Sequence, residues 1–101
     1  MEIAMKEKEL IKRVWHFSNL LAKKYRLKKI YLFGSLAEGS FLKGSDVDIA
    51  IEGMGFEDYL KALAEHRQIR GTHLDILHLD FCKPQIRDDI FKKGKVLYEK
   101  E

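Results

Sequence analysis

The chain has 101 residues, of which 46% are hydrophobic and 35% charged. This length suits one domain with a real core and leaves no room for a second, substrate-holding domain, so we expect residues 1–101 to form a single domain. The formal net charge of +3, without a dense basic tract, argues against direct nucleic-acid binding. Because the sequence contains no signal-peptide pattern and no membrane-spanning apolar run, we expect a cytoplasmic protein without membrane contact.

The first half of the chain predicts a long helix followed by two strands. Apolar residues at helical spacing predict an amphipathic helix over 7–26. The apolar run Lys29–Phe33 predicts a strand covered on both faces, and 46–51 predicts a second strand. Between them, Gly34 and Ser35 predict a turn into a short helix with Ser35 as its N-cap.

The second half predicts two more helices and two more strands. A helix is expected over 56–70, with Gly71 as its C-cap. A third strand is expected over 73–79, Pro84 would begin a final helix, and 95–99 would form a short edge strand. This alternation predicts an α/β (α+β) domain with a mixed sheet of about four strands flanked by helices.

Two aspartates one residue apart begin the second predicted strand. Strand alternation would place Val47, Ile49 and Ile51 on one face, and Asp46 and Asp48 together on the other. Like charges held this close repel one another unless a proton or cation neutralises them, and Mg²⁺ prefers carboxylate oxygens. The pair therefore predicts a magnesium site.

Further candidate site residues come from the neighbouring segments. Asp75 is an acid at the start of an otherwise apolar strand, and it would join Asp46 and Asp48 if the two strands are neighbours. Three convergent carboxylates are what two-metal catalysis at phosphorus requires. Gly34 permits close approach of a ligand, and the helix after Ser35 would offer free N–H groups to an anion. These residues together predict phosphate bound beside Mg²⁺.

The order G-S, ten residues, D-x-D and a later strand aspartate resembles the DNA polymerase β-type nucleotidyltransferase superfamily. With its short length and its ending over 94–99, the chain is similar to the minimal nucleotidyltransferases (MNT), which are paired with HEPN-domain partners in toxin–antitoxin systems. The resemblance implies that Gly34 and Ser35 bind the nucleotide triphosphate. It also implies that Asp46, Asp48 and Asp75 ligate two Mg²⁺ ions and form the catalytic set, with Asp75 helping to activate the acceptor hydroxyl.

The same resemblance implies a substrate and a partner. AMP would pass from ATP to a tyrosine of a HEPN toxin, and this chain would act as the antitoxin in a hetero-oligomer. One departure favours a different class of function: family members commonly carry arginine in a G-S-x-A-R-G pattern, whereas this chain has Glu38. The alternative is a catalytically weak or inactive module that neutralises its partner by binding. We favour the enzyme, because clustered carboxylates destabilise a fold without a cation.

The histidines do not add a predicted metal site. The four of them show no zinc-binding spacing. His73 and His78 have opposite parities on the third predicted strand, so both cannot point into one site.

Overall fold

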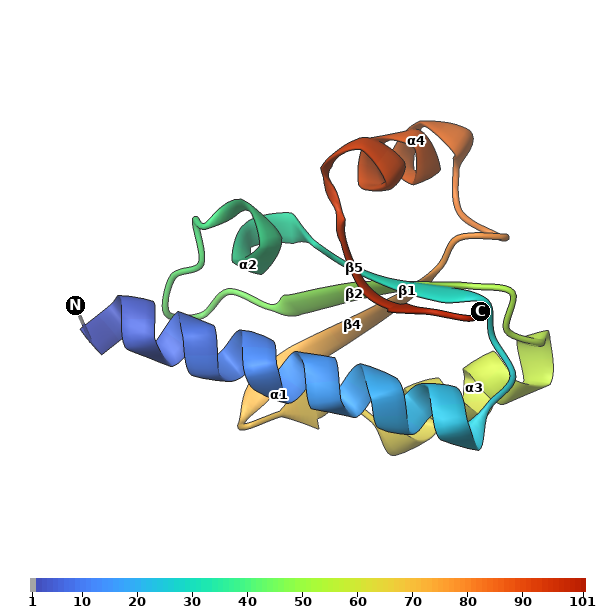
Figure 1. The fold of residues 1–101 in the computed structure, drawn as a ribbon, viewed down its shortest axis with the longest axis horizontal. Coiled ribbons are helices and arrows are strands. Elements are labelled where there is room, and N and C mark those ends of the chain that lie inside the picture. Colours follow the sequence, from blue (N-terminus) through green and yellow to red (C-terminus); the bar gives the residue numbers. More distant parts are fainter. Residues whose placement is uncertain (1) are drawn as a thin grey trace.

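The computed structural model describes the backbone of residues 2–101 and the side chains of residues 7–101. Helices and strands alternate along most of this chain (Figure 1). In chain order the elements are α1 (Glu2–Lys24), β1 (Lys29–Phe33), α2 (Gly34–Glu38), β2 (Val47–Glu52), α3 (Phe56–Glu65), β3 (Gln68–Ile69), β4 (Thr72–His78), α4 (Pro84–Lys93) and β5 (Lys95–Glu99).

The strands form one mixed sheet in the order β3-β4-β2-β1-β5. β2 pairs in parallel with β4, and the other neighbouring strands are antiparallel. The expected mixed sheet is thus confirmed, with five strands where about four were predicted. The parallel pairing has a direct consequence for the site, because it sets Asp48 beside Asp75.

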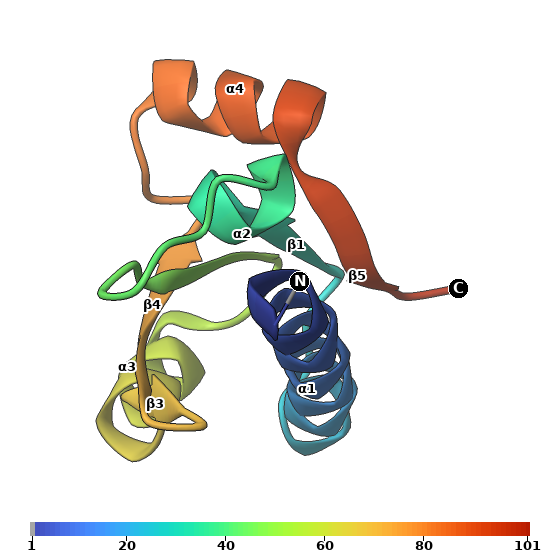
Figure 2. The ribbon, with the colours of Figure 1, turned by 90° about the vertical axis from the view of Figure 1, so that its left-hand side faces the viewer.

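Helices cover both faces of the sheet. α1 and α3 lie on one face, whereas α4 lies on the other (Figures 1 and 2). α2 lies beside the end of β1, and its buried residues Leu36 and Ala37 join the cluster shared with α1 and α3. Val47, Ile49 and Ile51 are fully buried in the cluster shared with α1 and α3. Burial of such side chains stabilises the fold by about 1.5–3 kcal/mol each. Ala50 belongs instead to the cluster containing Ile90 of α4, so the predicted alternation of β2 is confirmed.

A hairpin replaces the end of the helix predicted over 56–70, which was wrong in this part. α3 ends at Glu65, and the chain then forms β3, which pairs with the start of β4. Arg70 and Gly71 join these strands with φ of 53° and 78°. Two left-handed residues in succession are the signature of a type I′ turn, which matches the twist of a hairpin. Gly71 is therefore a turn residue, not a helix C-cap.

Three predicted boundaries also change. α1 is already helical from Glu2, although the expected helix began at residue 7. β2 begins at Val47, so Asp46 precedes the strand. α2 begins at Gly34 with extended Phe33 as its N-cap and no side-chain cap, so the prediction of Ser35 as N-cap was wrong. The positive φ of Gly34 turns the chain one residue earlier than expected.

The remaining predicted elements are confirmed. β1 has the expected bounds, α4 begins at Pro84, and β5 lies at a sheet edge beside β1. Among the helices described, none has the length and apolar character needed to cross a lipid bilayer.

Candidate active site

The candidate site lies where β1, β2 and β4 run side by side. Phe33 pairs with Asp48, and Asp48 pairs in turn with Asp75 on the other side of β2. Because Gly34 follows Phe33, the Gly34–Ser35 turn lies next to the Asp48 carboxylate. Asp46 lies just before β2, and one of its carboxylate oxygens is within 4.8 Å of one from Asp75. The structure therefore brings together all five residues that the sequence singled out.

Gly34 and Asp48 are in close contact. A Cβ atom added to Gly34 would overlap Oδ2 of Asp48, and Gly34 has a φ of 75°, which side-chain-bearing residues rarely adopt. Two independent constraints thus require glycine at this position. Ser35 follows in the half-buried first turn of α2, whose next residues Leu36 and Ala37 are buried and hold the short helix in place.

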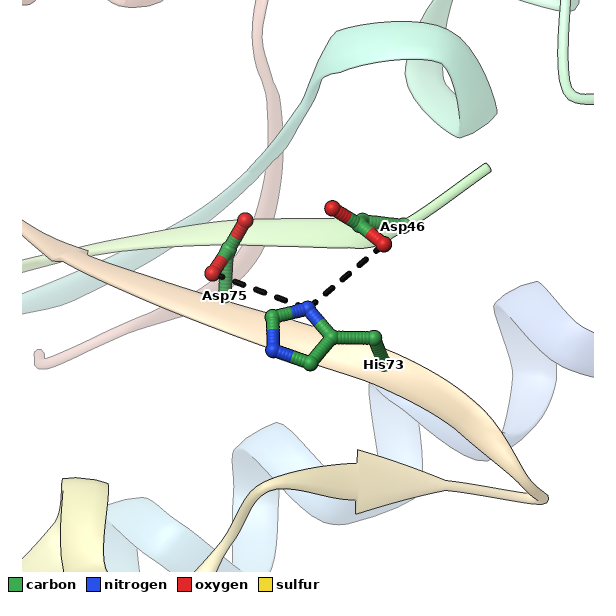
Figure 3. Close-up of side chains that lie close together, drawn as sticks. All are labelled: Asp46, His73 and Asp75. Carbon is green, nitrogen blue, oxygen red and sulfur yellow. Dashed lines mark ion pairs between the residues drawn. The ribbon is translucent and has the colours of Figure 1, made fainter. Parts of the chain in front are cut away.

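Asp46, His73 and Asp75 form a cluster at the surface. One ligand atom from each lies within 4.8 Å of the other two. Nδ1 of His73 lies 3.5 Å from Oδ1 of Asp46 and 3.7 Å from Oδ1 of Asp75 (Figure 3). The three side chains are about half exposed, at 45%, 57% and 55% respectively, so the cluster is open to solvent.

His73 is the one member of this cluster that the sequence reasoning missed. A signal for it was available, because His73 precedes Asp75 by two residues and therefore lies on the same face of β4. His78 lies on the opposite face, as its parity predicted. Its side chain is buried, and its Nε2 lies 2.6 Å from the carbonyl oxygen of Met54, so it has a structural role.

The electrostatics of the site centre on Asp48, which is affected by the charges of all three residues of this cluster. Burial, followed by the neighbouring charges of Asp75 and Asp46, raises the pKa of Asp48 from 3.8 to about 6, while His73 acts in the opposite direction. Near neutral pH this arrangement concentrates negative charge on one small patch. A divalent cation would relieve that repulsion, and the carboxylate oxygens present are the donors that Mg²⁺ prefers. The residues at the site therefore fit a divalent cation.

Glu38 occupies the position where the family resemblance implies arginine. It is the last residue of α2 and its side chain is exposed. α2 is the helix that begins at Gly34, so the negative charge lies one helical turn from the predicted phosphate-binding turn.

Comparison with known proteins shows the family to which this chain belongs. Residues 16–101 match the family model described as Polymerase beta, Nucleotidyltransferase. A Methanocaldococcus jannaschii protein, provisionally named a protein adenylyltransferase, is 30% identical over 93 residues, which cover 82% of this chain and 90% of that protein. A second protein of that organism with the same provisional name is 47% identical over 58 residues, 55% of each chain.

Solved structures give the same fold. The crystal structure of a toxin–antitoxin with AMP-PNP is 25% identical with a TM-score of 0.60, and the match covers 94% of this chain and 74% of that one. A structure provisionally described as a nucleotidyltransferase, from Sulfolobus solfataricus, is 21% identical with a TM-score of 0.63, over 96% of this chain and 86% of that one. The chain belongs to the Polymerase beta nucleotidyltransferase family and is a nucleotidyltransferase, as the G-S and D-x-D motifs predicted.

Proposed function

We propose that this protein transfers AMP from ATP to a hydroxyl group of a partner protein, in a reaction that depends on Mg²⁺. The observation that carries the proposal is the convergence of Asp46, Asp48 and Asp75 beside the Gly34 turn. In this reaction the acceptor oxygen forms a bond to the α-phosphorus of ATP. The bond from that phosphorus to the oxygen bridging to the β-phosphate breaks, and pyrophosphate leaves.

The three carboxylates would hold Mg²⁺, most simply as two ions. When bound, such ions neutralise the charge that develops on the transferred phosphate and on the leaving group. Asp48 is the best placed to position a nucleotide as well as an ion, because it lies against Gly34. Asp75 would accept the proton of the acceptor hydroxyl, since it is exposed at the open side of the cluster.

Gly34 and Ser35 would hold the triphosphate of ATP. Without a side chain, Gly34 leaves its backbone open to close approach by an anion. Ser35 contributes a backbone N–H in the first turn of α2, where N–H groups have no partner within the helix. Phosphates held there would lie next to Asp48, and the cation would lie between two negatively charged groups, the phosphates and the carboxylate.

The names of two relatives support a hydroxyl group of a protein as the acceptor of AMP. Both Methanocaldococcus proteins bear the provisional name protein adenylyltransferase, and the structural neighbour at 25% identity is a toxin–antitoxin with AMP-PNP. We therefore propose that the acceptor is a tyrosine of a HEPN-domain toxin, that the protein acts in the cytoplasm, and that it is the antitoxin. Tyrosine suits a carboxylate base, because a phenol with a pKa of about 10 loses its proton more readily than an aliphatic hydroxyl.

Glu38 supports a second candidate function, in which the fold binds and neutralises the partner with little or no catalysis. A carboxylate one turn from the phosphates opposes the binding of an anionic nucleotide. The two candidates differ in whether any AMP is transferred, so one experiment separates them.

That experiment is label transfer in a lysate of a host that contains the partner. ATP labelled at its α-phosphate is added with Mg²⁺ to the parent protein and to the Asp46→Asn, Asp48→Asn double variant. We expect label on one discrete protein with the parent alone. Absence of label with both, while the parent still captures a specific partner, would establish the binding module instead.

A further inference from the structure

His73 lies within ion-pair distance of two carboxylates and forms a hydrogen bond with neither. Its Nδ1 lies 3.5 Å from Asp46 Oδ1 and 3.7 Å from Asp75 Oδ1, longer than the usual N–H···O range of about 2.7–3.2 Å. Figure 3 shows the imidazole edge with Nδ1 facing both carboxylates.

The spacing of these atoms suits donors to a common cation. Donor atoms about 2.1 Å from one ion lie about 3.0 Å apart at a right angle and about 4.2 Å apart on opposite sides. Both measured separations fall between these limits. His73 and Asp75 also lie on the same strand, so the pleat of β4 sets the position of one side chain relative to the other.

We propose that His73 is a nitrogen ligand of the divalent cation at this site, so that the donor set combines one imidazole with carboxylates. This inference rests on the proposed function only in assuming that a cation is bound there. Nδ1 coordinates as the neutral imidazole with its proton on Nε2, the usual form of a histidine ligand. The site consequently favours Mn²⁺ over Mg²⁺ more strongly than carboxylates alone would, because imidazole suits transition metals and Mg²⁺ prefers oxygen.

Electron spin-echo spectroscopy of bound Mn²⁺ tests the proposal directly, because it detects nitrogen nuclei attached to the ion. The parent protein loaded with Mn²⁺ alone should show the nitrogen modulation of one imidazole. The His73→Ala variant should lose that modulation while Mn²⁺ remains bound through the carboxylates. His16→Ala is the matched control, since it removes an exposed histidine of α1 and should leave the modulation unchanged. Absence of nitrogen modulation in the parent, or its persistence in His73→Ala, overturns the proposal.

Metal affinity gives a second readout. Loss of even an outer-sphere partner weakens metal binding about 10- to 100-fold, so His73→Ala should weaken Mn²⁺ binding at least about tenfold. Mg²⁺ binding, measured by competition, should weaken less. Equal losses for both ions would contradict a nitrogen ligand. A parent that transfers AMP but shows no nitrogen modulation would overturn this inference alone, whereas nitrogen modulation without any transfer would overturn only the proposed function.

Discussion

Asp48 lies so close to Gly34 that any side chain at position 34 would overlap its carboxylate. The residue expected to hold the cation and the residue expected to meet the phosphates are therefore packed against each other. β1 and β2 enforce this contact, because Phe33 and Asp48 are register partners in the antiparallel pair. Nucleotide and cation binding should consequently respond together to changes at either residue.

Replacing Gly34 by Ala should displace the Asp48 carboxylate and reduce AMP transfer at least about a hundredfold, the effect of an ångström-scale misplacement at a reacting centre. The strained φ should also lower the free energy of unfolding by about 1–3 kcal/mol. Gly39→Ala is the matched control, because Gly39 has a φ of 78° but no atom within 4 Å of an added Cβ. It should lose similar stability and keep its transfer activity; equal loss of activity in both variants would contradict the role of the Gly34–Asp48 contact.

Replacing Asp48 by Asn should abolish transfer and stabilise the cation-free protein near neutral pH. The substitution removes a charge that burial, Asp75 and Asp46 all disfavour. Discounted for solvent screening, the gain in the free energy of unfolding is about 1 kcal/mol. Asp89→Asn, at an exposed position of α4, should change stability by less than about 0.5 kcal/mol. Urea unfolding measures both, and marked destabilisation of Asp48→Asn would identify a structural aspartate instead.

The contribution of Asp48 to the stability of the cation-free protein should fall as the pH rises from 3.8 to about 6. Over this window the native Asp48 keeps its proton while the unfolded chain has released it, so the native state binds more protons and loses stability with rising pH. The fall should be about 1–2 kcal/mol after screening, measured by urea unfolding in the presence of a chelator.

Two controls belong to this pH series. The Asp48→Asn variant should lack the part of the slope that Asp48 contributes. Mg²⁺ should raise the free energy of unfolding above the window, since the ion binds the native state in preference to the unfolded chain. A parent and a variant with identical pH dependence would contradict the raised pKa of Asp48.

Replacing Glu38 by Arg should tighten ATP binding about two- to tenfold, because a repulsive charge near the phosphates becomes an attractive one. The matched control is Glu57→Arg, which makes the same change of charge in the first turn of α3. Titration calorimetry with ATP and Mg²⁺ would compare them. Equal affinities of the two variants would mean that Glu38 does not face the nucleotide.

The sequence predicted the fold class and the mixed sheet, and it predicted from strand alternation which face of β2 carries the aspartates. Alternation in β2 was sufficient to separate Val47, Ile49 and Ile51 from the aspartates, because a buried apolar face fixes the register of a strand. The pairing of Asp48 with Asp75 needed a further assumption, that β2 and β4 are neighbours, which no local pattern determines. The structure supplied that strand order.

The missed hairpin shows where local patterns mislead. Gly71 fits a helix C-cap and a type I′ turn equally well, and Arg70 gives no sign that it adopts a left-handed φ of 53°. β3 has only two residues, too few for a visible alternation. His73 was missed for another reason: it was tested against zinc spacing within the sequence, whereas its partner Asp46 comes from the segment before β2.

The most direct test of the central claim is to give the protein and its co-expressed partner ATP labelled at either the α- or the γ-phosphate, with Mg²⁺. The labelled protein is then digested, and the modified residue is identified by mass spectrometry. The account predicts label from the α-phosphate alone, attached as AMP to a tyrosine, and none with the Asp46→Asn, Asp48→Asn double variant. Label from the γ-phosphate, or equal labelling by the parent and the double variant, would contradict AMP transfer by these carboxylates.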